Sequence, residues 1–97
     1  MTRLRWHPQA RAEAGAAAAF YQEKRAGLAQ RFLDNLEDTL HRIERHPLLY
    51  RQIEGEIRKC RVPRFPYGVI YRIRATDIEI IAVMHLRRTP GYWKDRG

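Results

Sequence analysis

The sequence predicts an α+β fold in which a helix hairpin packs on an antiparallel sheet. Two observations support this prediction. As far as Pro47 the apolar residues recur mainly at helical spacing, and beyond it they alternate with the period of two that is typical of strands. The run "IEIIAVMHLR", residues 78–87, is apolar on both faces in its middle, as expected of a central strand buried on both sides. Helices followed by strands in series are typical of the α+β class.

The first expected element is a short strand at residues 3–6. Leu4 and Trp6 face one side there and two arginines face the other, which is the alternation of a half-buried strand. Proline cannot donate to a strand ladder, so Pro8 ends this element.

Two helices are expected next, as an antiparallel hairpin. The first spans residues 9–25, where alanine, the strongest helix former, dominates. Gly27 lies in the tight connector because glycine can adopt the left-handed conformation that closes a helix. The second helix runs from residue 28 to residue 46, before Pro47. Its apolar stripe consists of Phe32, Leu36, Leu40 and Ile43.

Three strands are expected after a loop over residues 46–56. They begin at "IRKCRV", "GVIYRIR" and "IEIIAVMHLR", and turns at "PRFPY" and "RATD" separate them. A three-stranded antiparallel meander is the simplest arrangement of such a series. The helix hairpin can cover one face of this sheet, which leaves part of the other face open.

Length and composition indicate one basic domain, residues 1–97. The 19 Lys and Arg residues against 11 Asp and Glu residues give a net charge of +8, which attracts polyanions. The apolar runs are too short for a membrane span or a signal peptide, so a cytoplasmic protein is expected. Cys60 is the only cysteine and the four histidines are scattered, so no metal or cofactor is expected.

Basic and aromatic residues concentrate in the second half of the chain, whereas no nucleophilic triad, phosphate-binding glycine loop or zinc-protease motif is present. Arginines hold phosphates and exposed aromatic rings stack on bases, so this set suits RNA. Arginine forks match carboxylates equally well, so it also suits an acidic protein partner. The residues are Lys59, Arg61, Arg64, Arg72, His85, Arg87, Arg88, Tyr92 and Trp93.

Several stretches together resemble the RelE/ParE superfamily of bacterial type II toxins, and its ParE side most closely. They are "AAAFYQEKRAGLAQRF", "HPLLYRQI", "RFPYGVIYRI" and "IEIIAVMHLRRTPGYWKDR", and they cover nearly the whole chain. The resemblance implies an N-terminal strand, a helix hairpin and a meander packed on the helices. It also implies a toxin that arrests growth and is neutralised by a co-expressed antitoxin, as in plasmid stabilisation.

The superfamily contains two kinds of toxin. RelE-type members cleave messenger RNA on the ribosome with a basic site that needs no metal. In this sequence Lys59 and Arg61 match the first basic pair of that site, and Tyr92 matches its tyrosine. At the positions of the two arginines of that site, this sequence has Gly68 and Leu86, whose side chains offer no hydrogen-bond donor.

ParE-type members lack that catalytic set and poison DNA gyrase, and we favour this interpretation. It expects no catalytic residue in this chain and a toxin–antitoxin hetero-oligomer. Residues expected to contact the target or the antitoxin are Arg61, Arg64, Arg87, Arg88, Tyr92 and Trp93.

Two alternatives remain open. One is a ribosome-dependent RNA endonuclease, with His85 or Arg87 replacing a missing arginine beside the matched positions. The other is a nucleic-acid-binding module that is not a toxin, which the charge permits. The catalytic residues of the endonuclease would be Lys59, Arg61, His85 and Tyr92.

Overall fold

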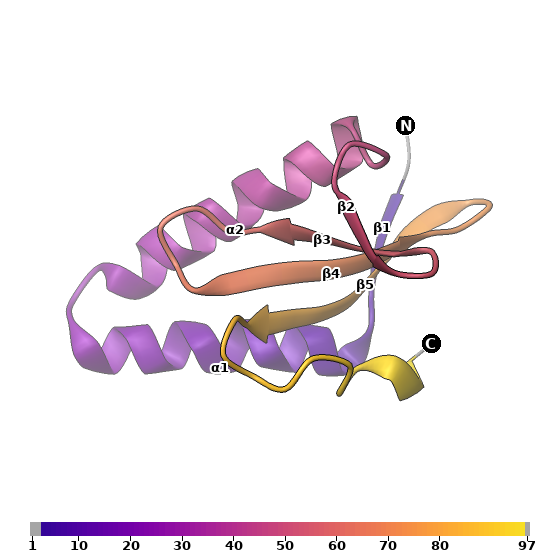
Figure 1. Cartoon of the computed structure of the whole chain (residues 1–97). Helices are drawn as coiled ribbons and strands as arrows, with labels where there is room; N and C mark the ends of the chain where they lie inside the picture. The colour runs from indigo at the N-terminus through magenta and orange to yellow at the C-terminus, as the bar shows by residue number, and fades with distance from the viewer. Residues whose placement is uncertain (1–2, 97) are drawn as a thin grey trace.

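The computed structural model describes residues 3–96 and confirms the α+β fold class (Figure 1). No helix within this range is long and apolar enough to cross a membrane. The elements in chain order are β1 (Arg3–Trp6), α1 (Pro8–Lys24), α2 (Leu28–Arg45), β2 (Arg51–Glu54), β3 (Ile57–Arg61), β4 (Tyr67–Ile73), β5 (Asp77–His85) and a short 3-10 helix, η1 (Lys94–Arg96).

One five-stranded sheet joins all the strands in the order β1-β5-β4-β3-β2. The strands β2 to β5 form an antiparallel meander, and β1 lies parallel to β5 at one edge. The meander therefore has one strand more than expected, because β2 occupies part of the stretch 46–56 that was predicted to be a loop. Ile53 is the only apolar residue of β2, so this edge strand has too little alternation to be recognised from sequence.

The two helices lie within a residue of their predicted bounds. Pro8 occupies the first turn of α1, where its missing N–H costs nothing. Gly27 has a φ of 83°, the left-handed conformation expected of the connector. Figure 1 shows both helices behind the sheet, with β2 and the C-terminal segment in front.

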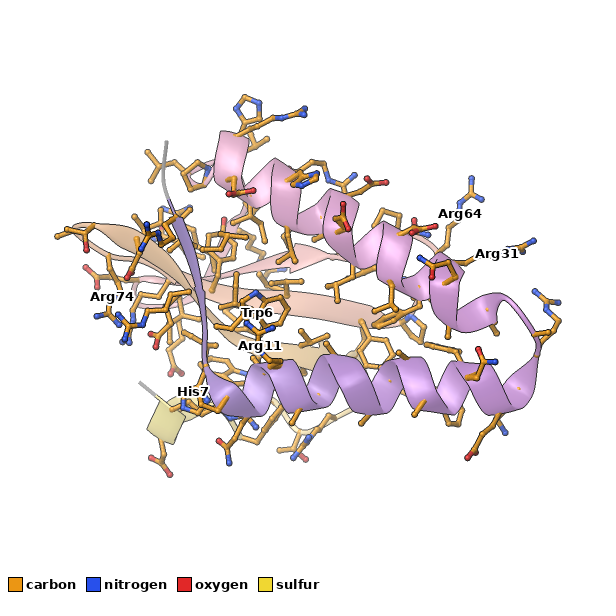
Figure 2. All side chains as sticks on the ribbon, turned by 180° about the vertical axis from the view of Figure 1, so that it is seen from behind. Trp6, His7, Arg11, Arg31, Arg64 and Arg74 are labelled. Carbon is orange, nitrogen blue, oxygen red and sulfur yellow. The ribbon has the colours of Figure 1, made fainter. Side chains whose placement is uncertain are left out.

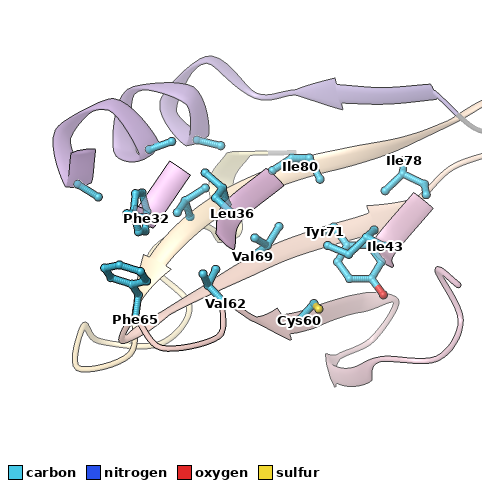
Figure 3. Packing of buried hydrophobic residues seen from close by; sticks show 14 of the residues in the cluster. Phe32, Leu36, Ile43, Cys60, Val62, Phe65, Val69, Tyr71, Ile78 and Ile80 are labelled. Carbon is cyan, nitrogen blue, oxygen red and sulfur yellow. The ribbon is translucent and has the colours of Figure 1, made fainter. Parts of the chain in front are cut away.

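The main core lies between the helices and the sheet (Figure 3). An aromatic cluster closes one end of it, where the ring of Phe32 packs against the rings of Tyr21, Phe65 and Tyr67 at centroid distances of 5.3 to 5.4 Å. These rings come from α1, α2, β4 and the turn before β4. Phe32 and Leu36 thus pack in the core, as the sequence predicted.

A second, smaller core lies on the other face of the sheet. β5 contains a bulge beside it: Ile70 pairs with Ala82 and Tyr71 pairs with Ile80, so that Ile81 has no partner on β4. The extra residue leaves Ile81 and Ala82 on this second face, while the residues before and after them belong to the main core. Trp93 covers the second face from the C-terminal segment.

Candidate functional site

The second face of the sheet carries the basic pair expected from the first meander strand. Lys59 and Arg61 alternate with buried Cys60 on β3, so both point away from the helices. Gly68 pairs with Arg61 on β4. The Cγ and Cδ atoms of Lys59 lie 3.1 Å from the position that a Cβ on Gly68 would take, and Leu86 lies 3.7 Å from it. The stem of Lys59 therefore fills the space above the glycine.

His85 lies on the opposite face of the sheet from this pair. It is paired with Tyr67, and the centroids of the two rings are 5.1 Å apart. Tyr67 packs against the helix-side core, which places His85 on that side. Its Nδ1 accepts a hydrogen bond of 3.1 Å from the backbone N–H of Arg87. His85 is thus separated from Lys59 and Arg61 by the sheet itself.

Tyr92 is bound to a carboxylate on α1, that of Glu13, which belongs to no motif in the sequence. Its hydroxyl donates to Oε2 of Glu13 at 2.7 Å, and the guanidinium of Arg88 lies 3.6 Å from the centre of its ring. Arg96 donates to both carboxylate oxygens of Glu13, at 2.8 and 3.1 Å. Arg88 completes the set with a longer contact of 3.4 Å to Glu13. We refer to Glu13, Arg88, Tyr92 and Arg96 as the Glu13 cluster.

The Glu13 cluster also provides hydrogen-bond partners for backbone groups of β5 that lie beyond the end of β1. The pairing of β1 stops at Ile80, so the edge groups beyond it have no strand partner on that side. The N–H of Val83 donates to Glu13 at 3.0 Å, and the carbonyl of Ile81 accepts from Arg96 at 3.2 Å. Buried backbone groups need such partners, so the cluster replaces a missing stretch of strand.

The pKa of Tyr92 is raised well above its usual range, first by burial and then by the hydrogen bond to Glu13 and the charge of that carboxylate. Both the hydrogen bond and the nearby negative charge favour the neutral phenol. Tyr92 is therefore placed to hold its proton rather than to release it.

The stability of the fold at alkaline pH tests whether Tyr71 is buried. Burial raises the pKa of Tyr71 to about 12. A folded pKa above the unfolded value of about 10 stabilises the neutral phenol, so this contribution is complete below about pH 10 and disappears as the pH rises towards 12. We expect the free energy of unfolding, measured by urea denaturation, to fall over this pH range. A Tyr71→Phe variant that loses stability as steeply as the wild type would contradict this assignment.

Trp93 was expected to contact the target or the antitoxin, but its ring is buried in this structure. The residue is only 3% exposed and packs against Ile70, Ile81 and Met84. The second face of β5 is apolar in its middle, and burying that face requires a cover, which the ring of Trp93 provides from the C-terminal segment.

The remaining predicted contact residues lie at separate places on the surface. Arg64, with a φ of 68°, borders a groove at the tip of the helix hairpin together with Arg31, and Figure 2 shows both arginines projecting into solvent. The side chain of Arg87 is exposed, and that of Arg88 belongs to the Glu13 cluster.

The four residues of the endonuclease interpretation are therefore not brought together. Lys59 and Arg61 share one face, His85 lies on the other, and Tyr92 is bound to Glu13 beside the edge of β5. Within residues 3–96, no three His, Cys, Asp or Glu side chains meet as a metal ion would require.

Comparison with known proteins agrees with this architecture. A solved structure described as "Chromosomal ParDE TA system from P. aeruginosa" matches with a TM-score of 0.66 and 16% sequence identity, over 90% of this chain and 98% of that one. At that identity the match shows a shared fold. A search of curated protein sequences finds no match.

The family follows from the sequence itself. Residues 4–90 match the ParE toxin family, described as the ParE toxin of the type II toxin–antitoxin system, parDE. This chain is thus a toxin of the type II toxin–antitoxin class. It belongs to the ParE toxin family, and the predicted family resemblance is confirmed.

Proposed function

We propose that this ParE-family chain arrests growth by inhibiting DNA gyrase, without chemistry of its own, and that a cognate antitoxin neutralises it. The whole chain, residues 1–97, acts as one toxin domain in the cytoplasm. The main support is the surface around Gly68. Where the RNA-cleaving branch has two arginines, this chain has Gly68 and Leu86, and the stem of Lys59 fills the space that a side chain at Gly68 would enter.

RNA cleavage needs groups that this surface does not offer. The negative charge that develops on the oxygens of the phosphorane-like transition state must be stabilised, and each missing donor typically costs about 10²- to 10³-fold in rate. Protons must also move to and from the reacting oxygens. The Tyr92 hydroxyl is held by a carboxylate, its pKa is raised, and His85 lies beyond the sheet.

The antitoxin is expected to cover toxin surface with a segment that carries acidic and apolar residues. The charge of +8 favours such a partner, and exposed Arg61 and Arg87 are available on the described surface. Attraction between opposite net charges raises the association rate and makes it sensitive to salt.

Controlled expression of the chain in bacteria tests the proposed mode of action. We expect induction of the DNA-damage response and altered supercoiling of a reporter plasmid, with no new messenger-RNA 5′ ends on translating ribosomes. If a small open reading frame that encodes an acidic C-terminal segment lies beside the toxin gene, its product should restore growth.

The matched variants for this experiment are Arg61→Ala and Tyr92→Phe, which remove two of the groups that an RNA-cleaving site would use. Codon-phased RNA cuts that disappear in these variants, together with unchanged plasmid supercoiling, would establish the ribosome as the target. A chain that is harmless when expressed alone would contradict both modes of action.

A further inference from the structure

Two adjacent leucines stand out on the surface. Leu48 and Leu49, in the turn between α2 and β2, are 72% and 69% exposed. They are the most exposed large apolar side chains within residues 3–96, ahead of Phe20 and Leu33. Single exposed apolar residues are common on protein surfaces, but a contiguous pair at this level of exposure is typical of an interaction site.

The backbone that carries the two leucines is held by the sheet. Nη1 of Arg58 donates to the carbonyls of Leu48 and Tyr50, at 3.2 and 2.8 Å. The hydroxyl of Tyr71 donates to the carbonyl of Pro47 at 2.6 Å. Arg58 and Tyr71 are themselves a cross-strand pair of β3 and β4. The turn is thus fixed to the centre of the fold, and a partner that binds it has little backbone entropy to remove.

A shallow groove continues from this turn. Tyr50 directly follows the leucines and lines a groove of about 450 Å³ together with Cys60 and Pro63, between α2 and β3. Arg42 and Arg61 border the same groove. An apolar floor with basic groups at its rim is complementary to a segment in which apolar and acidic residues alternate. Exposed arginines also flank the leucines in sequence, at positions 45 and 51.

A second copy of this chain fits the surface poorly. A symmetric dimer places the same patch of each protomer against the other. Around Leu48 and Leu49 this would bring together the flanking arginines, Arg45 and Arg51, of two chains that each carry a charge of +8. Like charges facing each other across an interface cost several kcal/mol. A partner of opposite charge is therefore favoured.

We propose that Leu48 and Leu49 anchor the antitoxin, whose acidic and apolar segment continues along the groove lined by Tyr50. This inference rests on the proposed neutralisation by an antitoxin, the partner to which the family description, a type II toxin–antitoxin system, refers. The leucines fill an apolar depression on that segment, and Arg42 and Arg61 pair with its carboxylates. The turn then determines which antitoxins this toxin accepts.

Calorimetric titration of the purified toxin with its antitoxin, identified as the small protein that co-purifies with it or is encoded beside its gene, tests the proposal. The variant carries Leu48→Ser and Leu49→Ser together. Phe20→Ser is the matched control, because it removes an exposed apolar side chain from the other end of the helix hairpin. We expect the double variant to bind about 100-fold more weakly or worse, and the control to change by about threefold at most. Circular dichroism and the thermal midpoint verify that both variants are folded.

Three results would overturn the proposal. Unchanged antitoxin affinity together with lost toxicity would assign the leucines to the target. A wild-type dimer that the double substitution dissociates in gel filtration would assign them to self-association. Binding of the wild type to anionic vesicles, lost in the double variant while antitoxin affinity is kept, would assign them to a membrane surface. If the wild type does not bind the antitoxin at all, the proposed neutralisation itself fails. If the wild type binds it and the double variant binds it equally well, only the role of the two leucines fails, so the two failures are distinguishable.

Discussion

Replacement of Glu13 by alanine is expected to lower the free energy of unfolding by about 3 to 5 kcal/mol, the usual cost of removing one partner from a buried charged pair. The side chains of Glu13 and Arg96 are only 15% and 10% exposed. Without the carboxylate, the Tyr92 hydroxyl loses its acceptor and Arg96 keeps only the carbonyl of Ile81. The N–H of Val83 is left unpaired on the edge of β5. Each unsatisfied buried group adds its own desolvation cost.

Urea denaturation of the wild type and the Glu13→Ala variant measures this effect. Glu23→Ala is the matched control, because Glu23 lies on the same helix and is exposed. Its removal should change stability by less than about 0.5 kcal/mol. A Glu13→Ala variant as stable as the Glu23→Ala variant would show that the cluster adds nothing to the fold.

Truncation of Phe32 is the second change with a large expected effect. Phe32 is fully buried, and Phe32→Ala should destabilise the chain by about 3 to 5 kcal/mol. The substitution removes the ring that contacts the other three members of the aromatic cluster. The cavity that it leaves therefore lies where α1, α2 and β4 meet. Chains of this length are stable by only about 5 to 15 kcal/mol, so the variant should be partly unfolded at 37 °C.

Leu33→Ala is the control for this substitution, because Leu33 is the next residue on α2 and is exposed. It should cost less than about 1 kcal/mol. Thermal unfolding followed by circular dichroism compares the two variants directly. Equal midpoints would mean that the space left by Phe32 closes without loss of packing.

The parts of the fold that could be predicted are those whose sequence pattern lies within one short stretch of the chain. The alanine-rich segment and the stripe through Phe32 and Leu36 gave both helices, because helix-forming residues and a 3.6-residue period are visible within one window. The apolar run 80–83 correctly indicated a strand buried on both faces. The bulge at Ile81 could not be predicted, because it depends on the register between β4 and β5.

The Glu13 cluster was missed for a related reason. Its hydrogen bonds connect residues that lie 70 to 83 positions apart, so no window of the sequence contains both partners. One signal was available. Glu13 shares a helix face with Ala10, Ala14 and Ala17, which are buried, so its spacing already placed a carboxylate on the face that packs. A charge at such a position needs a partner elsewhere in the chain.

The length of these connections also affects how the chain acquires its structure during synthesis. Protein chains leave the ribosome from the N-terminus at about 5 to 20 residues per second, and contacts between distant positions form late. The helix hairpin can assemble early, but β1 must wait for β5, and Glu13 must wait for Arg96. Until residue 96 has emerged, the carbonyl of Ile81 lacks its donor, and the Glu13 carboxylate that accepts from Val83 lacks the guanidinium of Arg96. The growing toxin can therefore pair its strands once β5 has emerged, but the Glu13 cluster is complete only after translation has passed Arg96.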